Sequence, residues 1–442
     1  MNNNVVLDPV NIAVVAPTGA GKTALISTVC DFIKSKTNKA DGFILEIEGK
    51  AAKELNTFKM KLRANLSAKN VKFDSATIDP TSECTHYDFS ISLQNENLLI
   101  KQPFKILDIP GAFINDPYSY QNSSEYEMFI KHLDSSRILW VPIDAAVLME
   151  AKTQDQITAS ELIRRVSNLE DFVKEWSDFA AKNNKTDYCN FVLLKSESYF
   201  SKDVLKKYNF CQKRFDESYK SIINKVKESN SEDKLSCVAV ETIGCVRVNR
   251  SKWNTKADEP SCDVDFDVLG TQQEIKGVDA LLTDVMKVAR ANINEQIDIV
   301  KTAKSSEASE LRIFKDELVD KYRRERECLT NNQTTLKYEL ENLQKDELEL
   351  IKKNLWDVIM DYFNENIKKL REKIYKTKLH IQSIEEEIDK LNSKIESISS
   401  MQVENDNDLS RVENEIAVYT SLMEKLSSLT SENLSSEYYR PL

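Results

Sequence analysis

The pattern of apolar and polar positions divides the chain into two parts of different character. Up to about residue 293, short apolar runs that fit single buried strands alternate with stretches of helical period. The runs are residues 11–15, 104–109, 137–145, 190–194 and 237–240, and residues 86–93 alternate as a strand of period two. Strands that alternate with helices predict an α/β domain over residues 1–293, with a mostly parallel sheet and a ligand at its carboxyl edge.

Two segments of this domain do not fit the alternation. Residues 37–75, rich in lysine and glutamate, are interpreted as a partly helical insertion. Residues 246–274 are interpreted as a polar loop in front of a closing helix that continues to residue 293. Both have the composition of surface segments, either as adaptors or as inert insertions.

From residue 294 the pattern becomes that of long helices, without glycine and without proline until Pro441. Apolar residues follow a three-four spacing typical of a coiled-coil seam, at Ile374, Ile381, Ile384, Ile388 and Leu391. A less regular stripe includes Leu318, Leu336 and Leu348. Such a stripe needs a partner, so residues 294–442 are predicted to form an extended all-α coiled-coil arm that folds back on itself or dimerises. Residues 401–408 are the favoured hairpin tip, with 331–333 as another candidate, and a bundle packed on the first domain stays open.

The first candidate chemistry lies in residues 16–23, which read Ala-Pro-Thr-Gly-Ala-Gly-Lys-Thr between an apolar run and a helical pattern. Strand, glycine loop and helix in this order predict a phosphate-binding loop, and hence a P-loop NTPase domain, because backbone N–H groups and the helix dipole face the phosphates. Lys22 would reach the β- and γ-phosphates, and the Thr23 hydroxyl would bind Mg²⁺. Ala16 replaces the usual first glycine, which requires a negative φ there. The expected phosphate-binding residues are Thr18, Gly19, Ala20, Gly21, Lys22, Thr23 and Ala24.

A second motif ends the apolar run that begins at residue 104. Residues 108–111 read Asp-Ile-Pro-Gly. In a phosphate-loop fold, an aspartate at the carboxyl end of the neighbouring strand holds Mg²⁺, and a following glycine N–H meets the γ-phosphate. We therefore assign Asp108 to the metal and Gly111 to the γ-phosphate.

Two further segments resemble elements of GTPases. The first lies before a predicted strand, and the second lies at the end of another. Residues 78–81, Ile-Asp-Pro-Thr, resemble the first switch of Ras-like GTPases. This resemblance implies that Thr81 binds Mg²⁺ with its hydroxyl and the γ-phosphate with its N–H, and Thr85 is the alternative. Residues 195–197, Lys-Ser-Glu, resemble the guanine-reading motif, with Glu197 in place of its usual aspartate.

The same resemblance implies how the base would be read. The Lys195 stem would lie along the purine, and the Glu197 carboxylate would accept hydrogen bonds from the guanine N1–H and amine. Leu194 departs from the Asn or Thr that usually begins the motif. Thr242 lies in a strand and turn at the place where GTPases put a backbone N–H on the guanine O6.

In their order and spacing, these motifs resemble the TRAFAC-class GTPases, the superclass that includes Ras-like proteins, translation factors, septins and dynamins. The resemblance implies GTP and GDP as ligands, Mg²⁺ as cofactor, and Lys22, Thr81 and Gly111 as the groups that act on the γ-phosphate. Ala112 and Phe113 follow Gly111, where Ras-like enzymes have a water-orienting glutamine. Intrinsic hydrolysis is therefore expected to be slow.

Other classes share parts of this layout. SMC-type ATPases combine a phosphate loop with a coiled coil, but there the coil interrupts the nucleotide domain, whereas all the motifs here precede it. Dynamin-like membrane remodellers also have Asp-x-Pro-Gly. A nucleotide-gated scaffold without useful turnover is a further alternative. The layout also resembles uncharacterised bacterial GTPases of conflict and antiviral defence systems.

Composition bears on partners and location. The net charge of −11 over 442 residues is no signal for nucleic-acid binding. The eight cysteines have no paired spacing, which favours reduced thiols in the cytoplasm and gives no zinc site. No apolar stretch approaches the length of a transmembrane helix. We therefore expect a protein partner or self-association through the coiled coil, as a homodimer or a hetero-complex.

Overall fold

The structure is a computed structural model of the chain. It describes residues 3–36, 43–47, 60–61, 64, 66, 72–73, 81, 83–95, 98–182, 187–199, 204–229, 235–270, 273–354, 368–394, 396–397, 410, 414, 417 and 439–442. The chain forms two compact units, one made of Met1–Gln296 with Leu422–Leu442 and the other of Ile297–Ser421. Among the described helices, none has the length and apolar character needed to cross a membrane.

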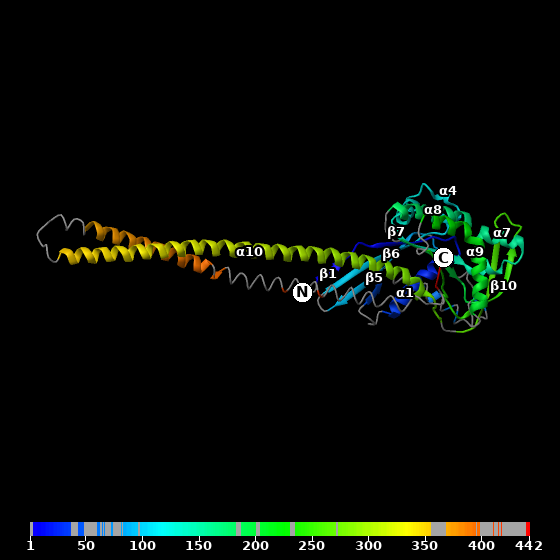
Figure 1. Ribbon diagram of the computed structural model, residues 1–442. Helices are drawn as coiled ribbons and strands as arrows, with labels where there is room; N and C mark the ends of the chain where they lie inside the picture. The colour runs from blue at the N-terminus through cyan, green and yellow to red at the C-terminus, as the bar shows by residue number, and fades with distance from the viewer. Residues whose placement is uncertain are drawn as a thin grey trace. The chain divides into compact units, whose positions relative to one another are not determined.

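The first unit is built on a mostly parallel sheet, as the alternation of strands and helices predicts. The described residues give it nine strands in the order β12-β9-β8-β7-β2-β6-β5-β3, with β1 beside β6. Figure 1 labels β1, β5, β6 and β7 of this sheet. The pairs β1·β6, β2·β6, β2·β7, β7·β8 and β8·β9 are parallel. The strands are β1 (Asn3–Val6), β2 (Val10–Val14), β3 (Phe43–Ile47), β5 (Thr85–Asn95), β6 (Leu98–Asp108), β7 (Ser136–Asp144), β8 (Tyr188–Leu194), β9 (Leu235–Ala239) and β12 (Tyr439–Pro441).

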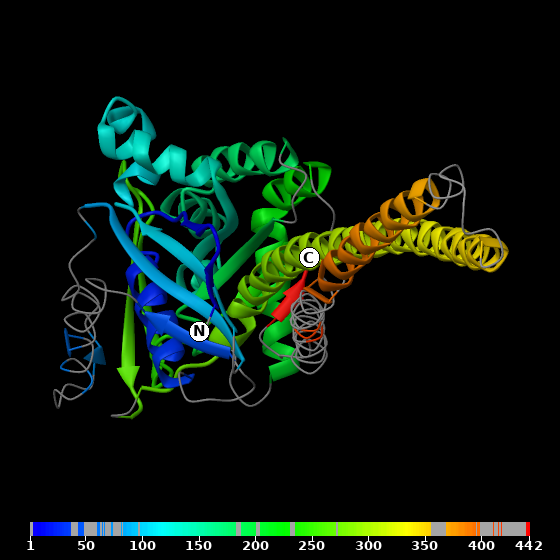
Figure 2. The same cartoon turned by 90° about the vertical axis from the view of Figure 1, so that its left-hand side faces the viewer.

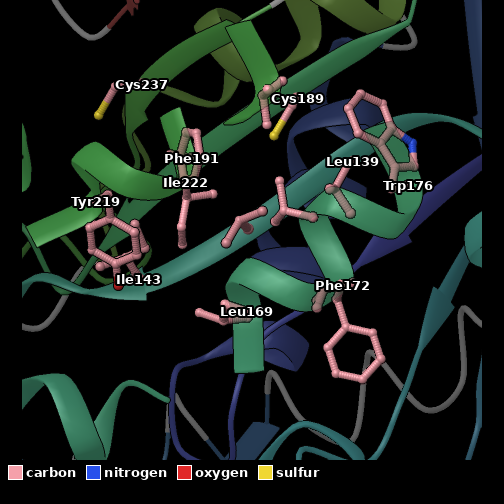
Figure 3. Packing of buried hydrophobic residues seen from close by; sticks show 14 of the residues in the cluster. Leu139, Ile143, Leu169, Phe172, Trp176, Cys189, Phe191, Tyr219, Ile222 and Cys237 are labelled. Carbon is pink, nitrogen blue, oxygen red and sulfur yellow. The ribbon is translucent and has the colours of Figure 1, made fainter. Parts of the chain in front are cut away.

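Helices cover both faces of this sheet. Alternate residues of β2 belong to different buried clusters, because side chains of a strand point to opposite faces. Ile12 and Val14 pack with α1 (Lys22–Lys36) and the start of α10 (Val278–Asn354). Ala13 packs with the helices of the other face, α5 (Ser124–Asp134), α8 (Val166–Lys182) and α9 (Val204–Ser229). Figure 3 shows part of this second cluster, including Trp176 and Phe172 of α8 and Tyr219 of α9.

Short helices connect the strands near their carboxyl ends. They are α3 (Ala112–Asn115), α4 (Pro117–Tyr120), α6 (Ala145–Glu150) and α7 (Gln154–Ile163). The α6 and α7 segments follow β7 directly, so their residues lie beside the edge of the sheet where a ligand is expected.

Residues 246–274 are not the polar loop that the sequence predicts. They contain β10 (Val246–Asn254) and β11 (Ser261–Val268), an antiparallel pair that β4 (Lys72–Phe73) extends to a second sheet. In β11, Val264 and Phe266 alternate with aspartates, and Phe266 is buried. Because the interleaved aspartates make the segment polar overall, the period of two was not recognised in the sequence. Most of the predicted insertion 37–75 lies outside the described residues.

The last residues of the chain are not part of the arm, contrary to the boundary expected for it. Strand β12 pairs antiparallel with β9, and Leu442 packs against the cluster of the α8 and α9 face. The Leu442 N–H donates to the Leu235 carbonyl at 3.0 Å. Arg440 also forms an ion pair with Asp216 at 2.8 Å. Sheet pairing and burial therefore assign these residues to the first unit.

In the second unit, α10 lies antiparallel to the helical residues 368–394 (Figure 1, Figure 2). Arg371 pairs with Glu347 at 2.8 Å, and Gln333 donates to Glu385 at 3.1 Å. The seam residues Ile374, Ile381, Ile384 and Leu391 are buried, which confirms that stripe.

The predictions for the less regular stripe and for the two candidate hairpin tips have different outcomes. Leu348, expected in the stripe, is exposed, and Leu343 is buried instead. The candidate tip at 331–333 is wrong, because these residues lie inside α10. The favoured tip at 401–408 lies outside the described residues.

Candidate functional site

A pocket of about 470 Å³ lies in the first unit where β2, β7 and β8 end. Its lining contains every predicted site residue except Asp108. These residues are Thr18, Gly19, Ala20, Gly21, Lys22, Thr23, Ala24, Thr81, Gly111, Lys195, Glu197 and Thr242. Thr85, the alternative to Thr81, is the first residue of β5 and is not in the lining. The fold thus gathers at one place residues that are up to 224 positions apart, from Thr18 to Thr242.

The glycine loop, residues 16–21, connects β2 to α1. Gly19 and Gly21 have φ of 81° and 98°, a conformation that other residues adopt at a cost. Among the described residues other than glycine, positive φ is limited to Arg165 and Lys195, so Ala16 meets its requirement. The Lys22 Nζ, at the start of α1, donates to the Ala16 carbonyl at 2.7 Å. Burial lowers the pKa of Lys22 to about 8, and the negative charge of Asp108 opposes this shift.

Three oxygen-bearing side chains meet beside this lysine. Thr23 Oγ1 lies 2.7 Å from both Thr81 Oγ1 and Asp108 Oδ2, and Thr81 Oγ1 lies 3.3 Å from the same carboxylate oxygen. The other oxygen of Asp108, Oδ1, is buried and has no hydrogen-bond partner in the described structure. Burial raises the pKa of Asp108, while Lys22 and the two hydroxyls act in the opposite direction.

This oxygen cluster fits a hard cation. Magnesium is commonly held by one or two carboxylates together with phosphate and water oxygens, and hydroxyls suit it as well. In the described part of the chain, no group of three or more His, Cys, Asp or Glu side chains is arranged to hold a metal ion. A cation here would therefore be held by one carboxylate and two hydroxyls, and the unpartnered Asp108 Oδ1 offers a further acceptor.

Gly111 lies against the backbone of the glycine loop. A Cβ at this position would come within 2.3 Å of the Thr18 nitrogen and 2.5 Å of its Cα, so no larger residue fits without movement. Asn115 of α3 reinforces this contact. Its Oδ1 accepts from the Thr18 N–H at 3.3 Å, and its Nδ2 donates to the Thr18 hydroxyl at 3.2 Å. The segment that follows Gly111 is therefore attached directly to the loop.

Lys195 connects three parts of the pocket. It follows β8 with a φ of 56°, a left-handed conformation that costs a residue with a Cβ about 1–2 kcal/mol. Its Nζ donates to the Gly19 carbonyl at 3.2 Å and forms an ion pair with Asp144. Asp144 ends β7, and its Oδ1 caps α6 by accepting from the Val147 N–H at 3.1 Å. Lys195 thus holds β7 and the glycine loop at fixed positions beside β8.

Glu197 holds the loop that contains Thr242. Its Oε1 accepts from the N–H groups of Ile243 and Gly244 at 3.1 and 3.4 Å. Burial raises the pKa of Glu197, and these backbone N–H groups oppose the shift. The Thr242 carbonyl in turn accepts from Gln273 at 2.7 Å. The carboxylate therefore has a structural partner in addition to any ligand.

Sequence reasoning missed other residues of the lining. Asp144 was interpreted only as the end of a buried strand, although a carboxylate at the end of an apolar run next to the glycine-loop strand is a usable signal. Arg164 and Tyr219 carry no such local signal, because they reach the pocket from the end of α7 and from the middle of α9.

Comparison with known proteins adds no assignment. No protein-family model matches the chain, and no curated protein matches it. Function is therefore inferred from the geometry of this pocket.

Proposed function

We propose that this chain binds GTP with Mg²⁺, hydrolyses it slowly, and acts as a molecular switch that couples its nucleotide state to a protein partner through the helical arm. The observation that carries the proposal is the meeting of Thr23, Thr81 and Asp108 beside Lys22 at the glycine loop. These residues come from three separate segments, and each has the chemistry that a triphosphate and its cation require.

The phosphate end of the pocket supports binding of a highly charged anion. The N-terminus of α1 and the backbone of the glycine loop supply N–H groups, and Lys22 supplies a positive charge. When bound, Mg²⁺ would bridge phosphate oxygens and neutralise their charge, and Thr23, Thr81 and Asp108 are the residues that would hold it. The pocket volume of about 470 Å³ lies in the range of small-molecule sites.

The other end supports a purine with donor groups at its edge. Lys195 lines this end, and its Nζ is held between Gly19 and Asp144, so its stem is available to lie along a purine. The Glu197 carboxylate and the loop that contains Thr242 line the same end. A carboxylate pairs with the N1–H and amine of guanine, whereas adenine offers no such pair of donors there, so this end favours GTP over ATP.

Slow hydrolysis follows from the residues after Gly111. Ala112 and Phe113 cannot orient a water molecule, and Phe113 is buried. Asn115 is the polar side chain of α3 in contact with the glycine loop, through Thr18. We propose turnover well below about 1 per second for the isolated chain, with acceleration by a partner or by self-association.

The deciding experiment compares two lysine substitutions in α1. Nucleotide carried through purification of the full chain is identified by mass, and GTP and ATP then compete with a fluorescent GDP analogue. Lys22→Met removes the buried charge at the phosphates, and Lys34→Met removes a charge from an exposed position of the same helix. Binding of GTP should be lost in Lys22→Met and should be unchanged in Lys34→Met.

Each outcome has a separate meaning. Wild-type affinity for GTP in Lys22→Met contradicts the proposed site as a whole. Equal affinity for GTP and ATP in the unaltered chain contradicts the assignment of Glu197 and favours an ATPase. Tight GTP binding without release of phosphate, with or without self-association, favours a nucleotide-gated scaffold over an enzyme.

A further inference from the structure

Asn115, the last residue of α3, contacts the glycine loop at Thr18. Its Oδ1 accepts from the Thr18 N–H at 3.3 Å, and its Nδ2 donates to the Thr18 hydroxyl oxygen at 3.2 Å. Because a backbone N–H can only donate, the first hydrogen bond determines which end of the Asn115 amide is the oxygen. The NH₂ group of Asn115 must therefore face the Thr18 hydroxyl.

This pairing directs the hydrogen of the Thr18 hydroxyl. A hydroxyl has one hydrogen to donate and two lone pairs with which to accept. Since the Thr18 oxygen accepts from Asn115, its own hydrogen does not point at Asn115 and is left to donate elsewhere. Thr18 is exposed and lines the pocket. Its hydroxyl is therefore oriented as a donor to a ligand in the pocket.

The Thr18 hydroxyl lies at the phosphate end of the pocket. A Cβ on Gly111 would come within 2.7 Å of Thr18 Oγ1, so the hydroxyl lies beside the Gly111 backbone. Gly111 is the residue whose N–H we assign to the γ-phosphate. A donor directly beside Gly111 is therefore placed for the terminal phosphate, and Lys195 and Glu197 line the end that we assign to the base.

Two further contacts hold Asn115 in place. Its backbone N–H donates to the Gly111 carbonyl at 3.0 Å, which fixes the turn after Gly111. Asn168 of α8 donates from Nδ2 to the carbonyl oxygens of Ile114 and Asn115, at 2.7 and 3.4 Å. Asn115 is also half-buried. The amide that faces Thr18 is thus supported by a neighbouring helix, and a supported donor loses little conformational entropy when a ligand binds.

We propose that the Thr18 hydroxyl donates to the terminal phosphate of a bound nucleoside triphosphate, and that Asn115 is the positioning residue that directs this donor. The inference rests on the proposed function, since it needs a nucleotide whose phosphates lie at the glycine loop. It extends that function by assigning a side chain that distinguishes a triphosphate from a diphosphate. A hydrogen bond to a charged group is roughly twice as strong as one between neutral groups, so this hydroxyl changes the ratio of GTP to GDP affinity.

The test measures the affinity of the full chain for GDP and for a non-hydrolysable GTP analogue with Mg²⁺, by displacement of a fluorescent GDP analogue. Thr18→Val removes the hydroxyl and keeps the branched shape. It should weaken binding of the GTP analogue by about tenfold or more and leave binding of GDP unchanged. Thr18→Ser keeps the hydroxyl, so it is the matched control and should preserve the ratio of the two affinities. Because Thr18 is exposed, neither variant should change the melting temperature without nucleotide.

Asn115→Ala tests the positioning role. It leaves the Thr18 hydroxyl in place but free to rotate, so binding of the GTP analogue should weaken by about threefold to tenfold, with binding of GDP and the melting temperature unchanged. If Asn115 acts through the hydroxyl, Asn115→Ala should have no further effect in a chain that already carries Thr18→Val. Asn122→Ala, at an exposed position after α4, is the control and should change neither affinity.

The outcomes separate this inference from the proposed function. Failure of the unaltered chain to bind either guanine nucleotide overturns the proposed function, and the inference with it. If the unaltered chain binds both, unchanged binding of the GTP analogue by Thr18→Val overturns the inference alone, and so does an equal loss of GTP-analogue and GDP binding. An effect of Asn115→Ala that persists in full in the Thr18→Val chain shows that Asn115 acts on the loop backbone, and this overturns its role in directing the hydroxyl.

Discussion

Replacement of Glu197 by glutamine should remove the proposed preference for GTP while the fold stays intact. In the structure, Glu197 Oε1 accepts from the N–H groups of Ile243 and Gly244 at 3.1 and 3.4 Å. Glutamine keeps one oxygen that can accept from these groups. It also places an NH₂ group where the carboxylate has its second oxygen. Guanine presents its N1–H and its amine at this edge, so donors would face donors.

The size of the effect follows from these contacts. A donor left without a partner in a buried site costs about 1–3 kcal/mol, which is on the order of tenfold to a hundredfold in affinity. The affinity for ATP should hardly change, because its base does not present this pair of donors. Glu197→Ala should lower the affinity for GTP as well, but it also removes the acceptor for the two loop N–H groups. Only the alanine variant should therefore lower the melting temperature appreciably.

Competition against a fluorescent GDP analogue, together with thermal melting, checks this prediction. The quantity to compare is the ratio of GTP to ATP affinity in the unaltered chain and in Glu197→Gln. Acidification should act in the same direction, since burial raises the pKa of Glu197 and a protonated carboxyl can no longer accept both hydrogen bonds. A folded Glu197→Gln variant with an unchanged ratio would refute the reasoning.

Three further predictions concern the glycine loop, its lysine and the arm. Gly111→Ala should destabilise the chain by about 1–3 kcal/mol and weaken GTP binding in titrations, because the new Cβ would lie 2.3 Å from the Thr18 backbone nitrogen. Gly270→Ala is the control and should change neither quantity, because the nearest atom to its Cβ lies at 3.5 Å. Equal melting temperatures of the two variants would contradict this prediction. Since Lys22 loses its charge as the pH rises through its pKa of about 8, the affinity for GTP should fall about fourfold between about pH 6.5 and 8.5. An affinity for GTP that does not change over this pH range would contradict the prediction. Ile384→Glu puts a charge in the buried seam and should lower the stability of the helical arm by on the order of several kcal/mol, as followed by circular dichroism, with GTP binding unchanged. Glu386→Lys, at an exposed position, is the control and should leave this stability unchanged. An Ile384→Glu variant as stable as the unaltered chain would contradict the prediction.

Much of the fold and the glycine loop of the candidate site could be predicted from the sequence, because these features depend on local patterns. Hydrophobic periodicity identifies the strands that became β2, β6, β7 and β8, and it also identifies the seam at Ile384. The order of strand, glycines and helix predicts the glycine loop, and in the structure Gly19 and Gly21 of this loop have positive φ. In each case the residues that determine the conformation are neighbours in the chain.

The tertiary structure alone decided the features that depend on pairing over long distances. The meeting of Thr23 with Thr81 joins residues 58 positions apart, and the return of β12 to the sheet depends on its register with β9. The hairpin β10·β11 was missed because its aspartates alternate with few apolar residues. Arg164 has no local signal at all. Its burial beside Tyr219 results from the packing of helices from separate segments, and periodicity within one segment does not specify which side chains of another segment it will meet.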